Sequence, residues 1–241
     1  MKTVIIAGGL STRLRPLTNF TPKPLLEING KKILDRTLEQ LMLAGIDNVI
    51  LNIGYLSEQF QKYYGDGHGA GLKIEYFLEQ ELNGTAGAVK KMAGILGDEQ
   101  ILVVYGDNLF NMDFKKIIQK PLAKESLGRI ILFDRTKSAY SGIAGGAVVL
   151  DEHGMIQKFI EGPESAELPL VNAGAYLLKP EILNYIPEGA ACDFGKHLFP
   201  LVLEAGKKIE GYVIFSEESV FGIDTLQTLE TTKNYYLKNK L

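Results

Sequence analysis

Residues 4–24 read VIIAGGLSTRLRPLTNFTPKP, and this stretch decides the fold class. Its first four residues are apolar without polar alternation, which is typical of a strand buried on both faces. The glycine pair that follows predicts a tight loop at the carboxyl end of that strand. Because open α/β sheets bind ligands at the carboxyl ends of their strands, we expect this loop to lie at a binding site.

Apolar runs and helical patterns alternate through the rest of the first half. Further buried strands are expected at 49–53, 74–78 and 101–105, and helical spacing predicts helices at 34–45, 59–64 and 86–96. This order favours a Rossmann-like mixed sheet, mostly parallel, with helices on both faces.

The second half changes to short strands. A turn at 151–154 separates apolar runs at 147–150 and 155–160, which predicts an antiparallel hairpin, and we expect another strand at 171–178 and a closing helix at 226–237. The sequence therefore predicts one α/β domain over residues 1–241 that carries an antiparallel β insertion.

Composition narrows the function classes. The 241 residues include 26 Lys and Arg against 29 Asp and Glu, a net charge of −3, which disfavours a nucleic-acid partner. No apolar run is long enough to span a membrane, and the first one is too short for a signal peptide. The single cysteine, Cys192, excludes an intrachain disulfide and fits a reducing cytoplasm.

The loop after the first strand has a local charge bias. From Gly8 to Pro24 it carries three cations, Arg13, Arg15 and Lys23, and no acid. Glycines let backbone N–H groups approach phosphate oxygens, so the pattern indicates an anion site. The loop has neither the Walker A motif nor the dinucleotide Gly-x-Gly-x-x-Gly motif.

Taken whole, residues 7–24 resemble the N-terminal signature of the sugar-1-phosphate nucleotidylyltransferases, and the resemblance continues along nearly the whole chain. It implies the nucleotide-diphospho-sugar transferase type of fold, with a nucleotide-binding half at about 1–125 and a sugar-phosphate half at about 126–241. It also implies that Arg13 holds the departing pyrophosphate and that Lys23 neutralises the α-phosphate. The loop residues expected to bind nucleotide are Gly8, Gly9, Ser11, Thr12, Arg13 and Lys23.

A second match to this family begins at Glu79. The family's Leu-Gly-Thr motif, which lines the base pocket, corresponds to Asn83, Gly84 and Thr85, with Asn in place of Leu. Thr85 is also a plausible N-cap of the following helix, and a plain capped helix is the alternative interpretation. The resemblance implies that Glu79, Gly84 and Thr85 bind the nucleotide.

Two aspartates match the family's metal ligands. Asp107 comes just after the strand expected at 101–105, and Asp224 lies in a late segment that resembles the family's aromatic-x-x-Asp motif, although Leu226 stands where glycine is common. The resemblance implies that both bind Mg²⁺, a hard cation that prefers oxygen ligands. The alternatives are a turn residue at Asp107 and a helix N-cap at Asp224.

The matches in the second half concern the sugar. The resemblance implies sugar binding by Gly146, Glu161, Asn172 and Gly174. The family usually reads Glu-Lys-Pro where this chain has Gly162 after Glu161, so the lysine that contacts the sugar phosphate is missing. Residues that could replace it are Lys158, Arg135 and Lys179.

The resemblance implies a Mg²⁺-dependent enzyme that joins a sugar 1-phosphate to a nucleoside triphosphate and releases pyrophosphate, supplying precursors of cell-surface polysaccharide. The carboxylate of Glu79 can only accept hydrogen bonds, and guanine offers two neighbouring donors, so GTP is favoured, with a mannose- or heptose-type 1-phosphate. CTP, UTP and dTTP stay open, as do a homo-oligomer, a sugar-nucleotide glycosyltransferase and an inactive regulatory relative. A glycosyltransferase commonly has Asp-x-Asp, which this sequence lacks.

Overall fold

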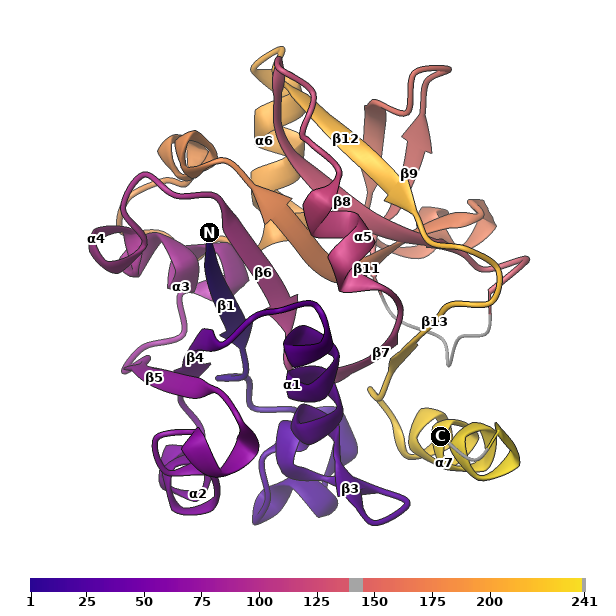
Figure 1. The fold of residues 1–241 in the computed structure, drawn as a ribbon. Helices are drawn as coiled ribbons and strands as arrows, with labels where there is room; N and C mark the ends of the chain where they lie inside the picture. The colour runs from indigo at the N-terminus through magenta and orange to yellow at the C-terminus, as the bar shows by residue number, and fades with distance from the viewer. Residues whose placement is uncertain (139–144, 240–241) are drawn as a thin grey trace.

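The computed structural model describes residues 1–138 and 145–239, and a nine-stranded sheet runs through this part of the chain (Figure 1). Its main path follows the order β10 (Ile156–Ile160), β9 (Ala147–Leu150), β11 (Leu170–Leu178), β6 (Ile101–Tyr105), β1 (Lys2–Ile6), β4 (Asn48–Ile53) and β5 (Lys73–Leu78). Off this path, β8 (Ser126–Asp134) pairs with β11 and with β12 (Lys208–Val213).

The two halves of the sheet differ in strand direction. In the first half β1 is parallel to β4 and β6, and β4 is parallel to β5. In the second half β11 is antiparallel to β6 and β8, and β9 with β10 forms the expected hairpin. The prediction of a mixed α/β sheet with an antiparallel insertion is therefore confirmed.

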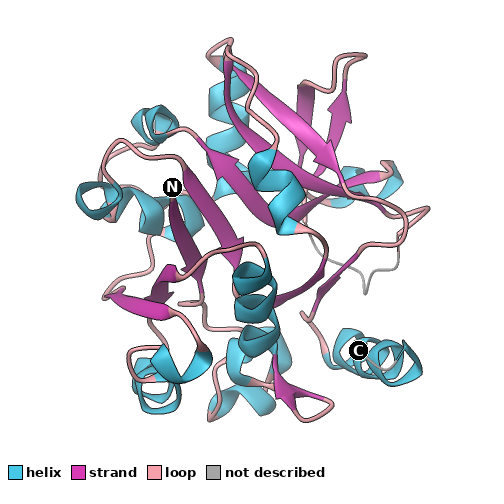
Figure 2. Cartoon of the chain, in the orientation of Figure 1, coloured by secondary structure: helices cyan, strands magenta, loops and turns pink. Residues whose placement is uncertain are grey.

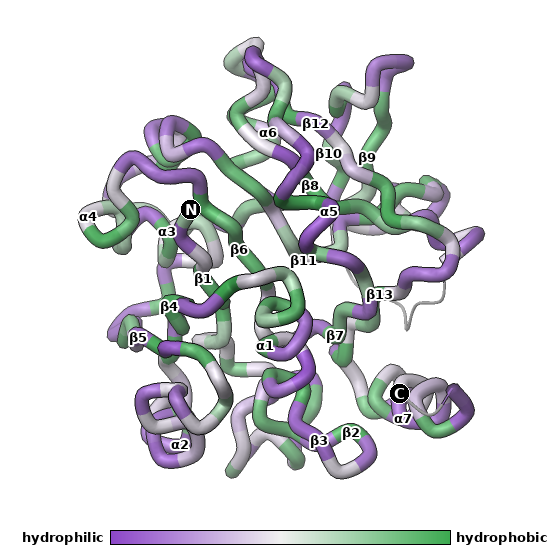
Figure 3. The backbone as a smooth tube through the Cα atoms, viewed as in Figure 1, coloured by the Kyte–Doolittle hydropathy of each residue, from purple (hydrophilic) through white to green (hydrophobic). Residues whose placement is uncertain are grey.

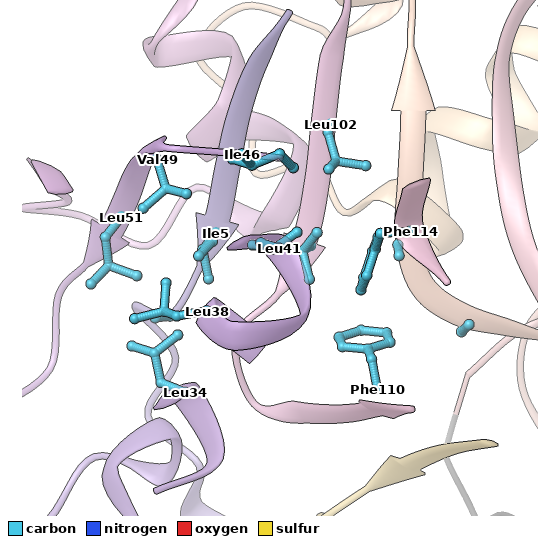
Figure 4. Close-up of a cluster of buried hydrophobic side chains, with 14 of the residues drawn as sticks. Ile5, Leu34, Leu38, Leu41, Ile46, Val49, Leu51, Leu102, Phe110 and Phe114 are labelled. Carbon is cyan, nitrogen blue, oxygen red and sulfur yellow. The ribbon is translucent and has the colours of Figure 1, made fainter. Parts of the chain in front are cut away.

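Alternate residues of each central strand serve two cores. In β1, Ile5 packs with α1 (Ile33–Leu43), α2 (Ser57–Tyr64) and α5 (Phe114–Gln119) on one face of the sheet (Figure 4). Val4 points to the other face, where α3 (Gly84–Lys91), α4 (Ala93–Leu96) and α6 (Phe199–Glu204) pack. Helices on both faces (Figure 2) bury both sides of the strand, which explains its apolar run without alternation (Figure 3).

Several elements escape the sequence patterns. The predicted helix at 86–96 is interrupted at Met92, where α3 ends and α4 begins. Strand β8 contains Gly128 and Arg129, which hide its strand character, yet Arg129 is fully buried. Its guanidinium donates to the carbonyls of Ile117 and Lys120 and pairs with Glu210, so the charge is satisfied inside the fold.

The C-terminal part is held by a small separate core. An antiparallel ribbon of β7 (Asn108–Asn111) and β13 (Ser219–Gly222) leads to α7 (Leu226–Asn239), whose Leu229 and Tyr236 pack on Leu14 and Phe221. A second short ribbon joins β2 (Glu27–Ile28) to β3 (Lys31–Lys32). None of the helices in the described ranges has the length and apolar character needed to cross a bilayer.

Candidate functional site

The loop after β1 is fixed by its own hydrogen bonds. It contains the short 3₁₀ helices η1 (Thr12–Leu14), η2 (Leu17–Asn19) and η3 (Lys23–Leu25). Ser11 adopts a left-handed conformation with φ 47°, which is unfavourable for a residue with a Cβ, and the buried Thr18 donates its hydroxyl to the Ser11 carbonyl at 2.9 Å. The backbone around Gly9 and Ser11 is thus shaped before any ligand binds.

Lys23 lies at the base of this loop and is only 3% exposed. Its Nζ is 2.9 Å from Asp107 Oδ2 and 3.0 Å from Asp224 Oδ1. Burial acts to lower the pKa of Lys23, but the carboxylates of Asp107 and Asp224 outweigh it and raise the pKa above its usual range. The ammonium group is therefore a permanent positive charge inside the site.

Arg13 completes a cluster of two cations and two anions. Its Nη2 lies 3.1 Å from the same Asp224 Oδ1 that contacts Lys23, while its side chain is 62% exposed. A cavity of about 290 Å³ is lined by this cluster together with Gly9, Ser11, Thr12, Leu14 and Ile223. Two of the three predicted cations of the loop, Arg13 and Lys23, and the two predicted metal ligands are thus brought together, whereas Arg15 does not line the cavity.

The two aspartates fit a magnesium ion. Both carboxylates already converge on one cation, the Lys23 ammonium, and Asp224 points to it rather than capping α7. Across residues 1–138 and 145–239, no three or more His, Cys, Asp and Glu side chains are grouped to hold a metal. An ion at this pair would draw its other ligands from phosphate oxygens and water, which is the usual arrangement for Mg²⁺.

A second cavity, of about 260 Å³, lies beside the first, at the carboxyl ends of β1, β4 and β6. The predicted residues Gly8, Gly9, Ser11, Glu79, Gly84, Thr85 and Asp107 line it, together with Asn52, Leu82, Tyr105 and Asp193. Glu79 is held in place, because its Oε1 accepts from the Asn83 N–H at 2.9 Å and its Oε2 from Asn52 Nδ2 at 3.3 Å.

The N-terminus of α3 is held by a segment from the second half of the chain. The carbonyl of Cys192 accepts from the N–H groups of Ala86 and Gly87, and Asp193 Oδ1 accepts from the Thr85 N–H at 3.0 Å. At Gly84, φ is +72°, and a Cβ would lie 2.6 Å from the Cys192 carbonyl oxygen, so glycine is required there.

Thr85 is not the N-cap that the sequence predicts. The helix begins at Gly84, and the capping position is Asn83, which makes no side-chain cap bond. Instead the Thr85 hydroxyl bonds with Asp193, the Phe194 N–H and the hydroxyl of Tyr105. The tertiary contact with residues 192–194 takes over the role of a local cap. Burial raises the pKa of Tyr105 to about 12, so its hydroxyl stays neutral.

The predicted sugar residues fall into two pairs. Gly146 and Glu161 lie together, since a Cβ on Gly146 would be 2.9 Å from Glu161 Oε1. Burial raises the pKa of Glu161. Asn172 and Gly174 form an irregularity in β11, where Asn172 Oδ1 accepts from the Gly174 N–H and Asn172 Nδ2 donates to the Tyr176 hydroxyl.

The three proposed replacements for the missing lysine lie in different places. Arg135 donates to the carbonyls of Ser165 and Ala166, and Lys179 donates to carbonyls at 123 and 124, beyond the far end of β11. Lys158 is exposed on β10, on the opposite side from Phe159 and Glu161. A fourth cation, Lys196, is close enough for its charge to favour the ionised form of Glu161.

Sequence patterns missed three polar residues that line the second cavity, and they also missed Lys196 near Glu161. Asp193 and Lys196 belong to the segment around the π-helix η7 (Phe194–Leu198), which has no local signature of a ligand site. Tyr105 is the last residue of β6 and Asn52 the last but one of β4, and only Asn52 offers a signal, as a polar residue within the apolar run 49–53.

Known proteins resemble this chain over most of its length. A family model described as nucleotidyl transferase matches residues 2–218. Mannose-1-phosphate guanylyltransferase of Mycobacterium tuberculosis is 34% identical over 214 residues, 87% of this chain and 58% of the relative. UTP–glucose-1-phosphate uridylyltransferase of Synechocystis sp. is 32% identical over 219 residues, which cover 86% of this chain and 56% of the relative. The chain thus spans a little over half the length of these curated relatives.

Solved structures share the fold. HddC from Yersinia pseudotuberculosis, complexed with GMP-PN, matches with a TM-score of 0.78 and 23% identity, covering 98% of this chain and 99% of that one. UDP-glucose pyrophosphorylase complexed with UDP-glucose matches with a TM-score of 0.78 and 18% identity, covering 99% and 98%. At these identities the likeness concerns the fold alone.

Proposed function

This chain belongs to the nucleotidyl transferase family, and on that premise we propose that it is a Mg²⁺-dependent sugar-1-phosphate nucleotidylyltransferase that prefers GTP. The observation that carries the proposal is the buried Lys23 ammonium between Asp107 and Asp224, beside Arg13 and under the glycine loop. This cluster suits a triphosphate, because it joins fixed positive charge to carboxylates that can share a metal ion.

The proposed reaction needs no proton-abstracting base. An oxygen of the sugar 1-phosphate forms a bond to the α-phosphorus, and the bond from that phosphorus to the bridging oxygen of the β-phosphate breaks, so pyrophosphate leaves with the electron pair. The attacking oxygen is already anionic. Catalysis then depends on positioning and on neutralising charge at the phosphorus.

Residues of this chain supply both contributions. Lys23, kept charged by its two aspartates, neutralises the α-phosphate, and the exposed Arg13 turns from Asp224 to the departing pyrophosphate. The preformed loop at Gly8, Gly9, Ser11 and Thr12 orients the phosphates. When bound at Asp107 and Asp224, Mg²⁺ supplies further charge neutralisation on the phosphates.

The base and the sugar are assigned from the remaining subsites. Glu79 presents acceptors to the base pocket, beside Gly84 and Thr85, which favours the two donors of guanine. Gly146 and Glu161 receive the sugar hydroxyls, with Asn172 and Gly174 shaping β11 behind them, and a mannose- or heptose-type 1-phosphate is the proposed partner. We place the reaction in the cytoplasm, as a source of precursors for cell-surface polysaccharide.

UTP is the second candidate nucleotide. The uridylyltransferase from Synechocystis sp. is 32% identical, close to the 34% of the guanylyltransferase, so sequence similarity alone separates the two poorly. The decision between them rests on the pocket around Glu79.

A pyrophosphate-release assay tests the proposal. The protein is incubated with Mg²⁺ and each pair drawn from GTP, UTP, CTP, dTTP and ATP and from mannose, heptose and glucose 1-phosphates. We expect release to be fastest with GTP, and a Lys23→Met variant serves as the control for contaminating activity. Release with another triphosphate would keep the family activity and reject GTP, and no release with any pair would reject the proposal.

A further inference from the structure

Asn52 is a buried polar side chain in an apolar strand. It lies one residue before the end of the buried run in β4 and is fully shielded from solvent, between Ile6 of β1 and Phe77 of β5. A buried amide is costly unless its hydrogen bonds are made, so its position at the pocket calls for an explanation.

The nitrogen and the oxygen of the Asn52 amide differ in their hydrogen bonding. Nδ2 donates to Glu79 Oε2 at 3.3 Å, whereas Oδ1 is buried and, within the described residues, has no hydrogen-bond partner. An unsatisfied buried acceptor is rare in folded proteins and commonly marks a place where a ligand or water completes the bonding. Each carboxylate oxygen of the neighbouring Glu79 already accepts one hydrogen bond, Oε1 from the Asn83 N–H and Oε2 from Asn52 Nδ2.

Gly8 leaves this oxygen open to a ligand. A Cβ on Gly8 would lie 3.2 Å from Asn52 Oδ1 and 3.3 Å from Glu79 Oε2, so both acceptors face the space beside the Gly8 backbone. Any larger residue at position 8 would close that space. Two acceptors that converge on one point match a ligand with two neighbouring donors.

We propose that Asn52 is a specificity-determining residue of the base pocket: Nδ2 fixes the carboxylate of Glu79, and Oδ1 accepts a hydrogen bond from the exocyclic amino group of a guanine. This rests on the proposed nucleotidylyltransferase function. Guanine carries N1–H next to its amino group, so Glu79 and Asn52 together satisfy both donors. Uracil and thymine lack the amino group, and in cytosine and adenine the ring nitrogen beside it is an acceptor, which a carboxylate repels.

The test compares two nucleotides that differ in one amino group. Dissociation constants of GTP and inosine triphosphate are measured by calorimetry without sugar phosphate, so that no turnover occurs. Wild type should bind GTP about 5- to 150-fold more tightly, the cost of one buried group left unpaired. Asn52→Leu should bring this ratio close to one. Asn48→Asp, at the exposed start of the same strand, should keep the wild-type ratio.

A second variant separates the two roles and covers a folding failure of Asn52→Leu. Asn52→Asp keeps an oxygen at Oδ1 but loses the donor to Glu79, so both nucleotides should bind more weakly while GTP stays the tighter one. Equal binding of the two nucleotides by wild type, or an unchanged ratio in Asn52→Leu, would overturn the inference. Because pyrophosphate release is measured separately, fastest turnover with another triphosphate would reject this role of Asn52 and the GTP preference but would keep the nucleotidylyltransferase activity.

Discussion

Replacing Lys23 with methionine should lower the thermal stability of the protein without Mg²⁺ and increase the stabilisation that Mg²⁺ provides. Methionine keeps an apolar stem of similar size but leaves Asp107 and Asp224, which now share one ammonium group at 2.9 and 3.0 Å, facing each other. Because both oxygens lie within 3.0 Å of one Nζ, they are at most about 6 Å apart, and at an effective dielectric constant of about 20 two carboxylates at that separation repel by about 3 kcal/mol. Asp107 is 33% exposed, so solvent screens part of this, and we expect about 1–3 kcal/mol, or a fall in Tm of roughly 2–12 °C.

Thermal unfolding with and without saturating Mg²⁺ measures the effect. The ion should raise the Tm of Lys23→Met more than that of wild type, because in wild type the ammonium competes for the same oxygens. Lys208→Met removes an exposed lysine that pairs with Glu125 and serves as the control. An equal response to Mg²⁺ in Lys23→Met and wild type would refute the shared cation site.

Four further outcomes are expected. Arg13→Ala should lower kcat by about 10²-fold or more with little change in Tm, because its side chain is 62% exposed; normal turnover would remove Arg13 from the phosphate site. Glu79→Gln should lower kcat/KM for GTP by about 5- to 150-fold, and an unchanged preference among triphosphates would show that the base is read elsewhere. Asp107→Asn and Asp224→Asn should each raise the Mg²⁺ concentration for half-maximal rate, less than additively together; additive effects would argue for separate sites. A hydrogen bond from the Thr136 hydroxyl is the main cause that lowers the pKa of Asp134, and the charge of Lys137 adds to it. The ionised carboxylate therefore stabilises the fold at pH values above the pKa that Asp134 has in the unfolded chain. This stabilisation is lost as the pH falls through the lower pKa of the folded protein. Asp134→Asn should therefore cost about 1–2 kcal/mol at pH 7 and progressively less as denaturant titrations move to more acidic pH, and a cost that does not change with pH would contradict the assignment.

The sequence was most informative where chemistry depends on local order. The glycine loop, Arg13 and Lys23 follow one strand closely, so their motif could be read without knowing the fold. Asp107 and Asp224 needed the resemblance, since 117 positions separate them in the numbering and only the β7–β13 ribbon brings them together.

Tertiary contacts explain what the sequence could not predict. Thr85 looked like a local N-cap, but Asp193 meets it from 108 residues away, and no spacing rule anticipates that contact. Strand β8 is difficult to predict because it contains Arg129, and charged residues are rarely found in buried strands. The position is favourable because backbone carbonyls accept hydrogen bonds from the buried guanidinium. The sequence analysis did not single out Asn52, and its unsatisfied oxygen is evident only in the structure.

The segment at residues 192–194 also bears on how the protein assembles. The N–H groups of Thr85, Ala86 and Gly87 find their acceptors on Cys192 and Asp193, so the wall of the base pocket is closed by a part of the chain that is synthesised much later. A fragment ending at residue 125 would leave these donors unpaired and would lack β11, the neighbour of β6. Contacts between parts of the chain this far apart close slowly, so we expect pocket formation to be a late event of folding. Nucleotide binding by a growing or refolding chain would consequently report that its second half has already docked.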